Sequence, residues 1–71
     1  MVEMLVVQSG TVAAVGYDAD SGDLHVQFHS SPSVYIYQGV PQNVFDSLLT
    51  SPSLGSFLHR EVIKVYPFYR G

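Results

Sequence analysis

Cysteine and tryptophan are absent from this 71-residue sequence, and basic side chains are scarce. The lack of cysteine excludes disulfide bonds, thiolate nucleophiles and cysteine-ligated zinc, and it fits a reducing compartment. No stretch approaches the roughly 20 apolar residues that a membrane-spanning helix needs, and no segment has the pattern of a signal peptide. These absences predict a cytoplasmic protein that does not enter a membrane.

The few basic residues all lie late in the chain, at Arg60, Lys64 and Arg70. Six acidic residues outnumber these three, so the net charge is −3. Proteins that follow a phosphate backbone need many Lys and Arg contacts. The charge balance therefore argues against a broad nucleic-acid surface and leaves room only for a small local site.

The acidic residues Asp18, Asp20 and Asp23 cluster in a segment whose spacing faintly resembles a calcium loop. Such a loop needs glycine at its sixth position and glutamate at its twelfth, which here are Asp23 and His29. We therefore expect a hairpin turn over 18–23. His25 and His29 share a strand face but lie about 13 Å apart, so they cannot hold one ion. The sequence predicts no metal and no cofactor.

Strand patterns fill the first half of the chain. Residues 11–17 and 24–29 read as two strands joined by the 18–23 turn, and Leu24, Val26 and Phe28 alternate with polar residues. The central run 34–37 places Tyr35 and Tyr37 on one face of a further strand, with apolar residues on the other. Because both faces are apolar, we expect this strand to be covered on both sides.

Helical patterns begin after Pro41, which suits the first turn of a helix. Apolar residues recur at helical spacing over 44–49, and a second short helix follows with Ser51 or Ser53 as its N-cap. Residues 63–66 fit a helix end or a strand equally well, and 67–71 are expected to form a short tail. The sequence thus predicts a single α+β domain over 1–71, with an antiparallel three- to four-stranded meander followed by two short helices packed on one face.

The apolar start of the chain allows two interpretations. Residues 1–6 form either a strand at the sheet edge or an exposed apolar arm that binds a partner by adding to it as a strand. Under the second interpretation the candidate partner-binding residues are the apolar side chains of this segment together with the late cations: Val2, Met4, Leu5, Val6, Arg60, Lys64 and Arg70.

Signatures of catalysis are missing. The sequence has no glycine-rich phosphate loop and no G-x-S-x-G elbow. His59, Arg60 and Glu61 are adjacent, so on a helix they point in different directions and do not form one site. We expect neither an enzyme nor a binding site for a small-molecule substrate.

An ordered set of short motifs runs along nearly the whole chain. It consists of Val7-x-Ser9 with Val12, Val15-Gly16-Tyr17-Asp18, Leu24-x-Val26-x-Phe28, Tyr35-x-Tyr37, Gly39-Val40-Pro41 with Val44-Phe45 and Leu48-Leu49, and Ser53-x-Gly55-x-Phe57-Leu58 with Val62 and Tyr66. Over residues 7–66 this set resembles the KTSC domain, a small module of bacteria and phages. The resemblance implies a β-meander with helices, no catalysis, and a suggested role in RNA binding.

Departures from the KTSC pattern weaken the expectation of RNA binding. Ile36 and Ile63 stand where the family often has basic residues, and His59 stands where it often has asparagine. The small size and acidic charge also resemble phage-encoded regulators that dock on host RNA polymerase, which would place the protein in the host cytoplasm.

Two hypotheses follow from these resemblances. The first is a transcription regulator or adaptor that binds a protein partner, with an RNA polymerase subunit favoured. The second is a direct single-stranded RNA-binding module in which Tyr35 and Tyr37 stack on bases.

Overall fold

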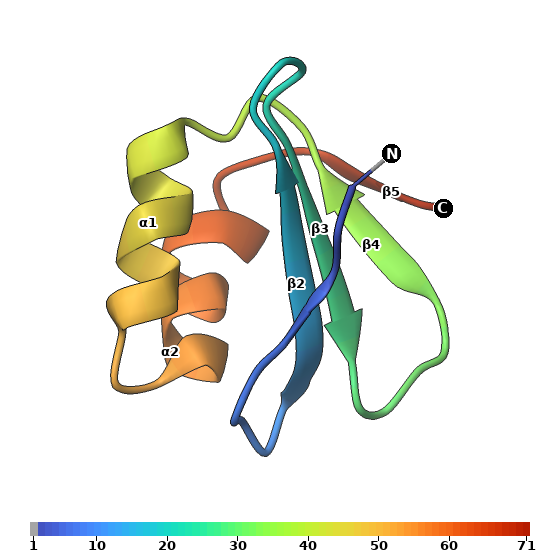
Figure 1. The fold of residues 1–71 in the computed structure, drawn as a ribbon, viewed down its shortest axis with the longest axis vertical. Coiled ribbons are helices and arrows are strands. Elements are labelled where there is room, and N and C mark those ends of the chain that lie inside the picture. The colour runs from blue at the N-terminus through green and yellow to red at the C-terminus, as the bar shows by residue number, and fades with distance from the viewer. Residues whose placement is uncertain (1) are drawn as a thin grey trace.

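The computed structural model describes residues 2–71 and contains one antiparallel sheet of five strands (Figure 1). The strands lie in chain order from one edge to the other: β1 (Leu5–Val6), β2 (Val12–Asp18), β3 (Asp23–Phe28), β4 (Val34–Tyr37) and β5 (Phe68–Arg70). Each strand is therefore hydrogen-bonded to its neighbours in sequence order, as in a meander.

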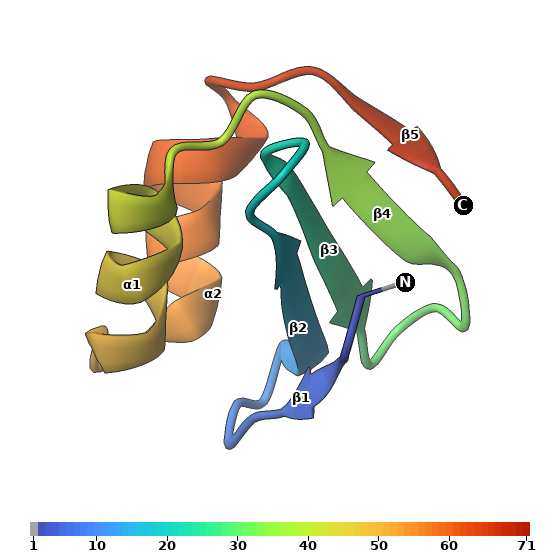
Figure 2. The same ribbon diagram turned by 45° about the horizontal axis from the view of Figure 1, so that its top comes forward.

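Two helical segments cover one face of this sheet. They are α1 (Gln42–Thr50) and α2 (Leu54–Leu58), and α2 continues into the π-helical turn η1 (His59–Ile63). Figure 2 shows both helices on the same side of the strands. The predicted α+β fold, with a meander and two helices on one face, is confirmed. No sequence pattern indicated the π-helical turn.

The predicted number of strands was too low, because the segment 67–71 contains β5. This strand pairs with β4, with Tyr69 opposite Ile36 and Phe68 opposite Tyr37. The Gln38 N–H donates to the Pro67 carbonyl at 2.9 Å, and the Gly71 N–H donates to the Val34 carbonyl at the same distance. These partners lie about thirty residues or more away in sequence. The three residues of β5 are too few to show a strand pattern that would predict this pairing.

The core lies between the sheet and the helices. Leu24 and Val26 of β3 are completely buried, as the alternation predicted, and Tyr37 beside them is 2% exposed. From the other layer, Leu48 of α1 and Leu58 of α2 are also completely buried. The polar residues of β3 accordingly lie on the opposite face of the sheet.

The face away from the helices is also partly covered, as expected for β4. Ala14, Gly16 and Ile36 are buried there although no helix lies over them. Residues 2–4 pass against Gly16, and Gly71 approaches the Ile36 side chain. The two ends of the described chain therefore help to close this face.

The 18–23 turn is tied to the segment that leads into α1. The Val40 N–H donates to the Gly22 carbonyl at 2.9 Å, and the Tyr17 hydroxyl donates to the Val40 carbonyl. Gly22 and Gly39 have positive φ values of 77° and 74°, which favour glycine. The hairpin end is thus fixed to the point where the chain changes from strand to helix. Among residues 2–71, no helix is long and apolar enough to cross a membrane.

Candidate functional site

The edge strand β1 presents an unpaired backbone and exposed apolar side chains. Leu5 pairs with Val15 and Val6 pairs with Ala14, while the Val7 N–H donates to the Ala13 carbonyl at 3.2 Å. Because hydrogen-bonded and non-hydrogen-bonded pairs alternate along antiparallel strands, the N–H and C=O of Val6 point away from β2. Val6 is 89% exposed and Leu5 is 40% exposed.

The two other apolar residues of the predicted arm lie against the sheet. Val2 and Met4 are half-buried. A Cβ placed on Gly16 would lie 2.9 Å from the Met4 Sδ atom and 2.8 Å from the Glu3 carbonyl oxygen. This segment therefore packs on β2, and of the four candidate arm residues only Leu5 and Val6 offer a free surface.

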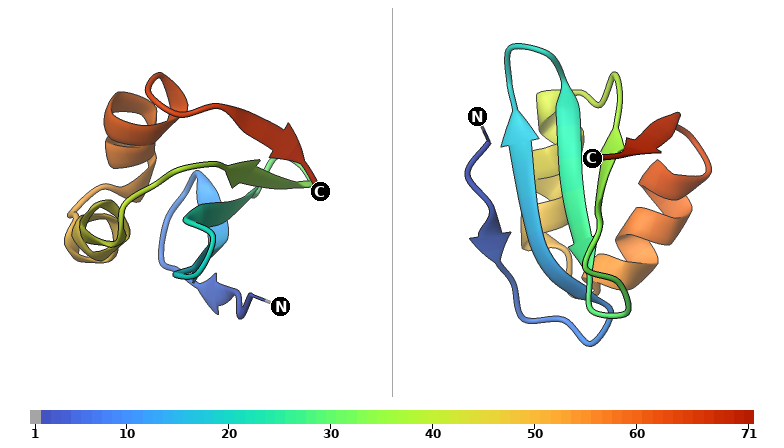
Figure 3. Two further views of the ribbon diagram at one scale, coloured as in Figure 1. Left: turned by 90° about the horizontal axis from the view of Figure 1, so that it is seen from above. Right: turned by 90° about the vertical axis from the view of Figure 1, so that its right-hand side faces the viewer.

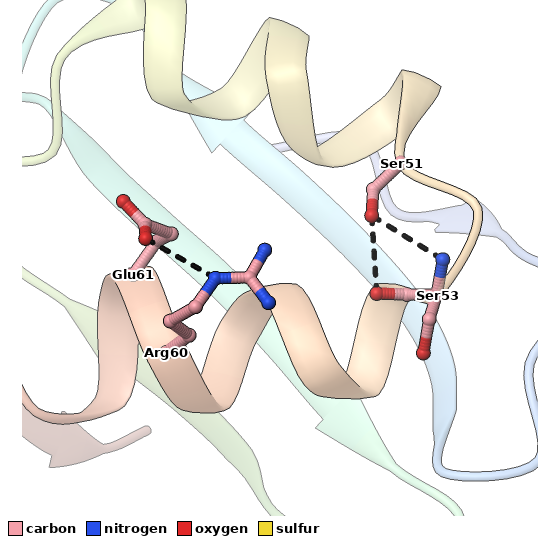
Figure 4. A network of polar contacts seen from close by, with 4 residues as sticks. All are labelled: Ser51, Ser53, Arg60 and Glu61. Carbon is pink, nitrogen blue, oxygen red and sulfur yellow. Dashed lines mark hydrogen bonds and ion pairs between the residues drawn. The ribbon is translucent and has the colours of Figure 1, made fainter.

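The candidate cations do not gather around β1. Arg60 lies on η1 and forms an exposed ion pair with Glu61 at 3.3 Å, as Figure 4 shows. Lys64 follows η1 and is exposed. Arg70 lies on β5 at the opposite edge of the sheet from β1, about four strand spacings or 19 Å away. A single partner surface that contains both β1 and Arg70 would have to span the whole sheet.

The two tyrosines of β4 lie on the helix-covered face. Tyr37 is 2% exposed, and this burial, with a smaller contribution from Tyr35, raises the pKa of its hydroxyl. Tyr35 is half-buried, and its ring stacks on Phe68 with the ring centroids 5.5 Å apart. A base can stack only on a free ring face, so the structure offers no such platform at Tyr37.

A polar hollow that the sequence did not indicate lies between the β1–β2 turn and α2. It has a volume of about 480 Å³ and is lined by Ser9, Gly10, Thr11, Ser53, Gly55, Ser56 and His59. The two walls meet closely, since a Cβ on Gly55 would lie 3.1 Å from the Thr11 hydroxyl. Ser51 accepts the Ser53 N–H at 3.3 Å and orders the start of α2 (Figure 4).

The hollow brings hydroxyl and imidazole groups together. Within residues 2–71 no hydrogen bond joins His59 to Ser56, and no three His, Cys, Asp or Glu side chains are grouped to bind a metal. A nucleophile needs a base within hydrogen-bond reach. The hollow can therefore donate and accept hydrogen bonds but shows no nucleophile–base pair.

Comparison with known proteins agrees with this architecture. The family model of the KTSC domain matches residues 8–66. A protein from Tsukamurella paurometabola is 38% identical over 53 residues, which cover 75% of this chain and 78% of that protein. One from Stutzerimonas stutzeri is 41% identical over 49 residues, which cover 69% and 68%. A crystal structure of a KTSC domain protein from Yersinia pestis has the same fold, with a TM-score of 0.94 at 24% identity over 100% of this chain and 99% of that one.

Proposed function

This chain belongs to the KTSC domain family, and on that premise we propose that it is a non-catalytic binding domain that docks on a protein partner through the free edge of β1. The observation that carries the proposal is the position of Val6. Its backbone N–H and C=O point away from the sheet, and the residue is 89% exposed.

The mechanism is addition of a strand from the partner to the sheet. An extended segment of the partner accepts the Val6 N–H and donates to its carbonyl, and so becomes a sixth strand. Val6 and Leu5 project to opposite faces of the sheet and contact alternate side chains of that segment. The packing of Val2 and Met4 against Gly16 holds β1 in the position where the added strand can pair.

The absence of a nucleophile–base pair in the polar hollow supports a non-catalytic role. Among residues 2–71 the hydrogen bonds of serine and histidine side chains go to backbone groups. These bonds order turns and the start of α2, which is a structural use of the same residue types.

The partner that we propose is a subunit of bacterial RNA polymerase, so that the protein acts as a transcription regulator or adaptor. Support comes from the acidic charge of −3 and from a docking edge whose exposed side chains are apolar. A surface of this kind suits a protein better than a phosphate backbone. The alternative, direct RNA binding through Tyr35 and Tyr37, stays a prediction that the burial of Tyr37 weakens.

The test is capture of partners from bacterial lysate, with and without nuclease treatment, on tagged wild-type protein and two variants. Val6→Pro removes the outward N–H, which takes no part in the pairing with β2, and edge strands tolerate proline at such positions. Val6→Ala shortens the same side chain and keeps the N–H, so it is the matched control.

We expect wild type and Val6→Ala to recover RNA polymerase subunits and Val6→Pro to lose them. Recovery that is equal for all three proteins would show that β1 is not the docking edge. Recovery that disappears after nuclease treatment would favour the RNA-binding alternative. Protection of the Val7 amide from hydrogen exchange confirms that β1 stays paired in each variant.

A further inference from the structure

We propose that β5, at the opposite edge of the sheet from β1, pairs with β5 of a second copy of this chain. The inference concerns a different edge from the proposed docking site, so either can fail without the other. Figure 3 shows β1 and β5 at the two outer edges, with β2, β3 and β4 between them.

The hydrogen bonds to β4 determine which groups of β5 are free. Gln38 bonds to Pro67 and Gly71 bonds to Val34, so the alternation places Tyr69 in a hydrogen-bonded pair with Ile36. Phe68 and Arg70 are then in non-hydrogen-bonded pairs, and their N–H and C=O groups point away from β4. Each copy therefore presents two donors and two acceptors, placed symmetrically about Tyr69.

This arrangement is complementary to itself about a two-fold axis at Tyr69. When two β5 strands meet antiparallel, Phe68 of one copy lies opposite Arg70 of the other, and the reverse pair forms on the other side of the axis. Each pair exchanges both N–H···O bonds, which gives four hydrogen bonds and satisfies every outward group of Phe68 and Arg70.

The side chains agree with the same register. Phe68 and Arg70 lie on the helix-covered side of the sheet, because they pair with Tyr37 and Tyr35. Phe68 is 51% exposed, and its ring stacks on Tyr35 and contacts Tyr37 at a tilted angle. The remaining free surface can receive the guanidinium of the second copy as a cation–π contact.

On the other side of the sheet, the two Tyr69 side chains face each other across the two-fold axis. Tyr69 is 46% exposed, and the two residues form a non-hydrogen-bonded pair whose Cα atoms lie about 4.5 Å apart. Aromatic pairs at such positions stabilise antiparallel strands. Any extended strand could satisfy the outward backbone groups of β5. A second copy also supplies the Phe68–Arg70 and Tyr69–Tyr69 side-chain contacts.

The resulting dimer would have a ten-stranded sheet with a β1 strand at each end. Its interface of three-residue strands is smaller than that of a permanent complex, so association is expected to be reversible and concentration-dependent. The dimer would then carry two copies of the docking edge.

Sedimentation velocity over a concentration series tests this inference on the full chain and on two variants. Arg70→Pro removes an outward N–H without affecting the bonds to β4, whereas Arg70→Ala removes only the side chain. We expect wild type to dimerise reversibly and Arg70→Pro to dimerise about tenfold or more weakly than Arg70→Ala. Wild-type protein that stays monomeric at every concentration overturns the proposal.

The register is tested by NMR on a mixture of labelled and unlabelled wild-type protein. A nuclear Overhauser effect between the Hα atoms of the two Tyr69 residues is expected, because these atoms approach closely only in a non-hydrogen-bonded antiparallel pair. A dimer that lacks this signal would contradict the proposal. So would a dimer that Val6→Pro abolishes and Arg70→Pro leaves unchanged, because it would pair through another surface.

Discussion

The Met4 Sδ atom lies 2.9 Å from the position that a Cβ on Gly16 would occupy. Residue 16 therefore lacks a side chain where the N-terminal segment crosses β2, and this allows the segment to lie on the sheet. The contact connects the conformation of residues 2–4 to the position of the β1 edge, which is the edge that we propose as the docking site.

Substitution of Gly16 by alanine should displace the N-terminal segment. The new methyl group would also lie 2.8 Å from the Glu3 carbonyl oxygen, a backbone atom that cannot move aside by rotation of a side chain. We expect a loss of about 1–3 kcal/mol in the free energy of unfolding, measured by urea denaturation, and faster exchange of the Val7 amide. The control is Gly10→Ala, since nothing lies within 4 Å of its Cβ position. Equal effects of the two substitutions would contradict the packing of residues 2–4 on Gly16.

Two adjacent leucines of α1 should respond very differently to truncation. Leu48 is completely buried between helix and sheet, whereas Leu49 is 43% exposed. Leu48→Ala is expected to reduce the free energy of unfolding by about 2–5 kcal/mol because it leaves a cavity, and Leu49→Ala by much less. Chemical denaturation of both variants measures the difference, and a larger loss for Leu49→Ala would mean that α1 turns its Leu49 side, and not its Leu48 side, toward the sheet.

Removal of the Tyr17 hydroxyl should loosen the hairpin end. This hydroxyl donates to the Val40 carbonyl, while the Tyr17 ring stacks on Phe45 at 5.1 Å between ring centroids. Tyr17→Phe keeps the ring contact and should cost about 0.5–1.5 kcal/mol of unfolding free energy. Tyr69→Phe removes the hydroxyl of an exposed tyrosine and is expected to leave stability unchanged. Thermal denaturation of the two variants therefore measures the contribution of the Tyr17–Val40 hydrogen bond. Identical melting temperatures would show that the bond does not stabilise the fold.

Alkaline pH should destabilise the protein through Tyr37. Burial raises the pKa of its hydroxyl above the ordinary value of about 10, so the folded state holds this proton more tightly than the unfolded state does. Stability that is fully present below about pH 10 is then lost as the pH rises through the raised pKa. Unfolding free energies of wild type and Tyr37→Phe, compared at neutral pH and above about pH 10, should show a smaller alkaline loss for the variant. Parallel pH profiles would contradict this assignment.

Local sequence patterns were sufficient for the strands and helices that bury a regular apolar face. The alternation of Leu24, Val26 and Phe28 predicted β3. The helical spacing of Val44, Phe45, Leu48 and Leu49 predicted the apolar side of α1, of which Phe45 and Leu48 are buried and Leu49 is 43% exposed. The apolar character of both faces of 34–37 predicted that this strand would be covered on both sides, and Ile36 and Tyr37 are indeed buried on opposite faces. The sequence left open whether the two tyrosines are exposed.

The remaining features depend on contacts between distant parts of the chain. β5 forms because Tyr69 meets Ile36 of β4, and the polar hollow forms because Thr11 meets Gly55 of α2. Neither contact has a signal within either segment alone. The direction of the Val6 backbone depends likewise on register with β2, so the sequence identified Leu5 and Val6 as candidates but could not separate them from Val2 and Met4.

Hydrogen exchange at single amides, with and without bacterial RNA polymerase, tests the docking proposal most directly. The Val6 N–H is unpaired in the free protein and should exchange rapidly, while the Val7 N–H, which donates to Ala13, should be protected. On addition of the polymerase, we expect Val6 to become protected and Phe68 at the opposite edge to stay unchanged. Failure to bind, or binding that leaves exchange at Val6 unchanged, would contradict docking through β1.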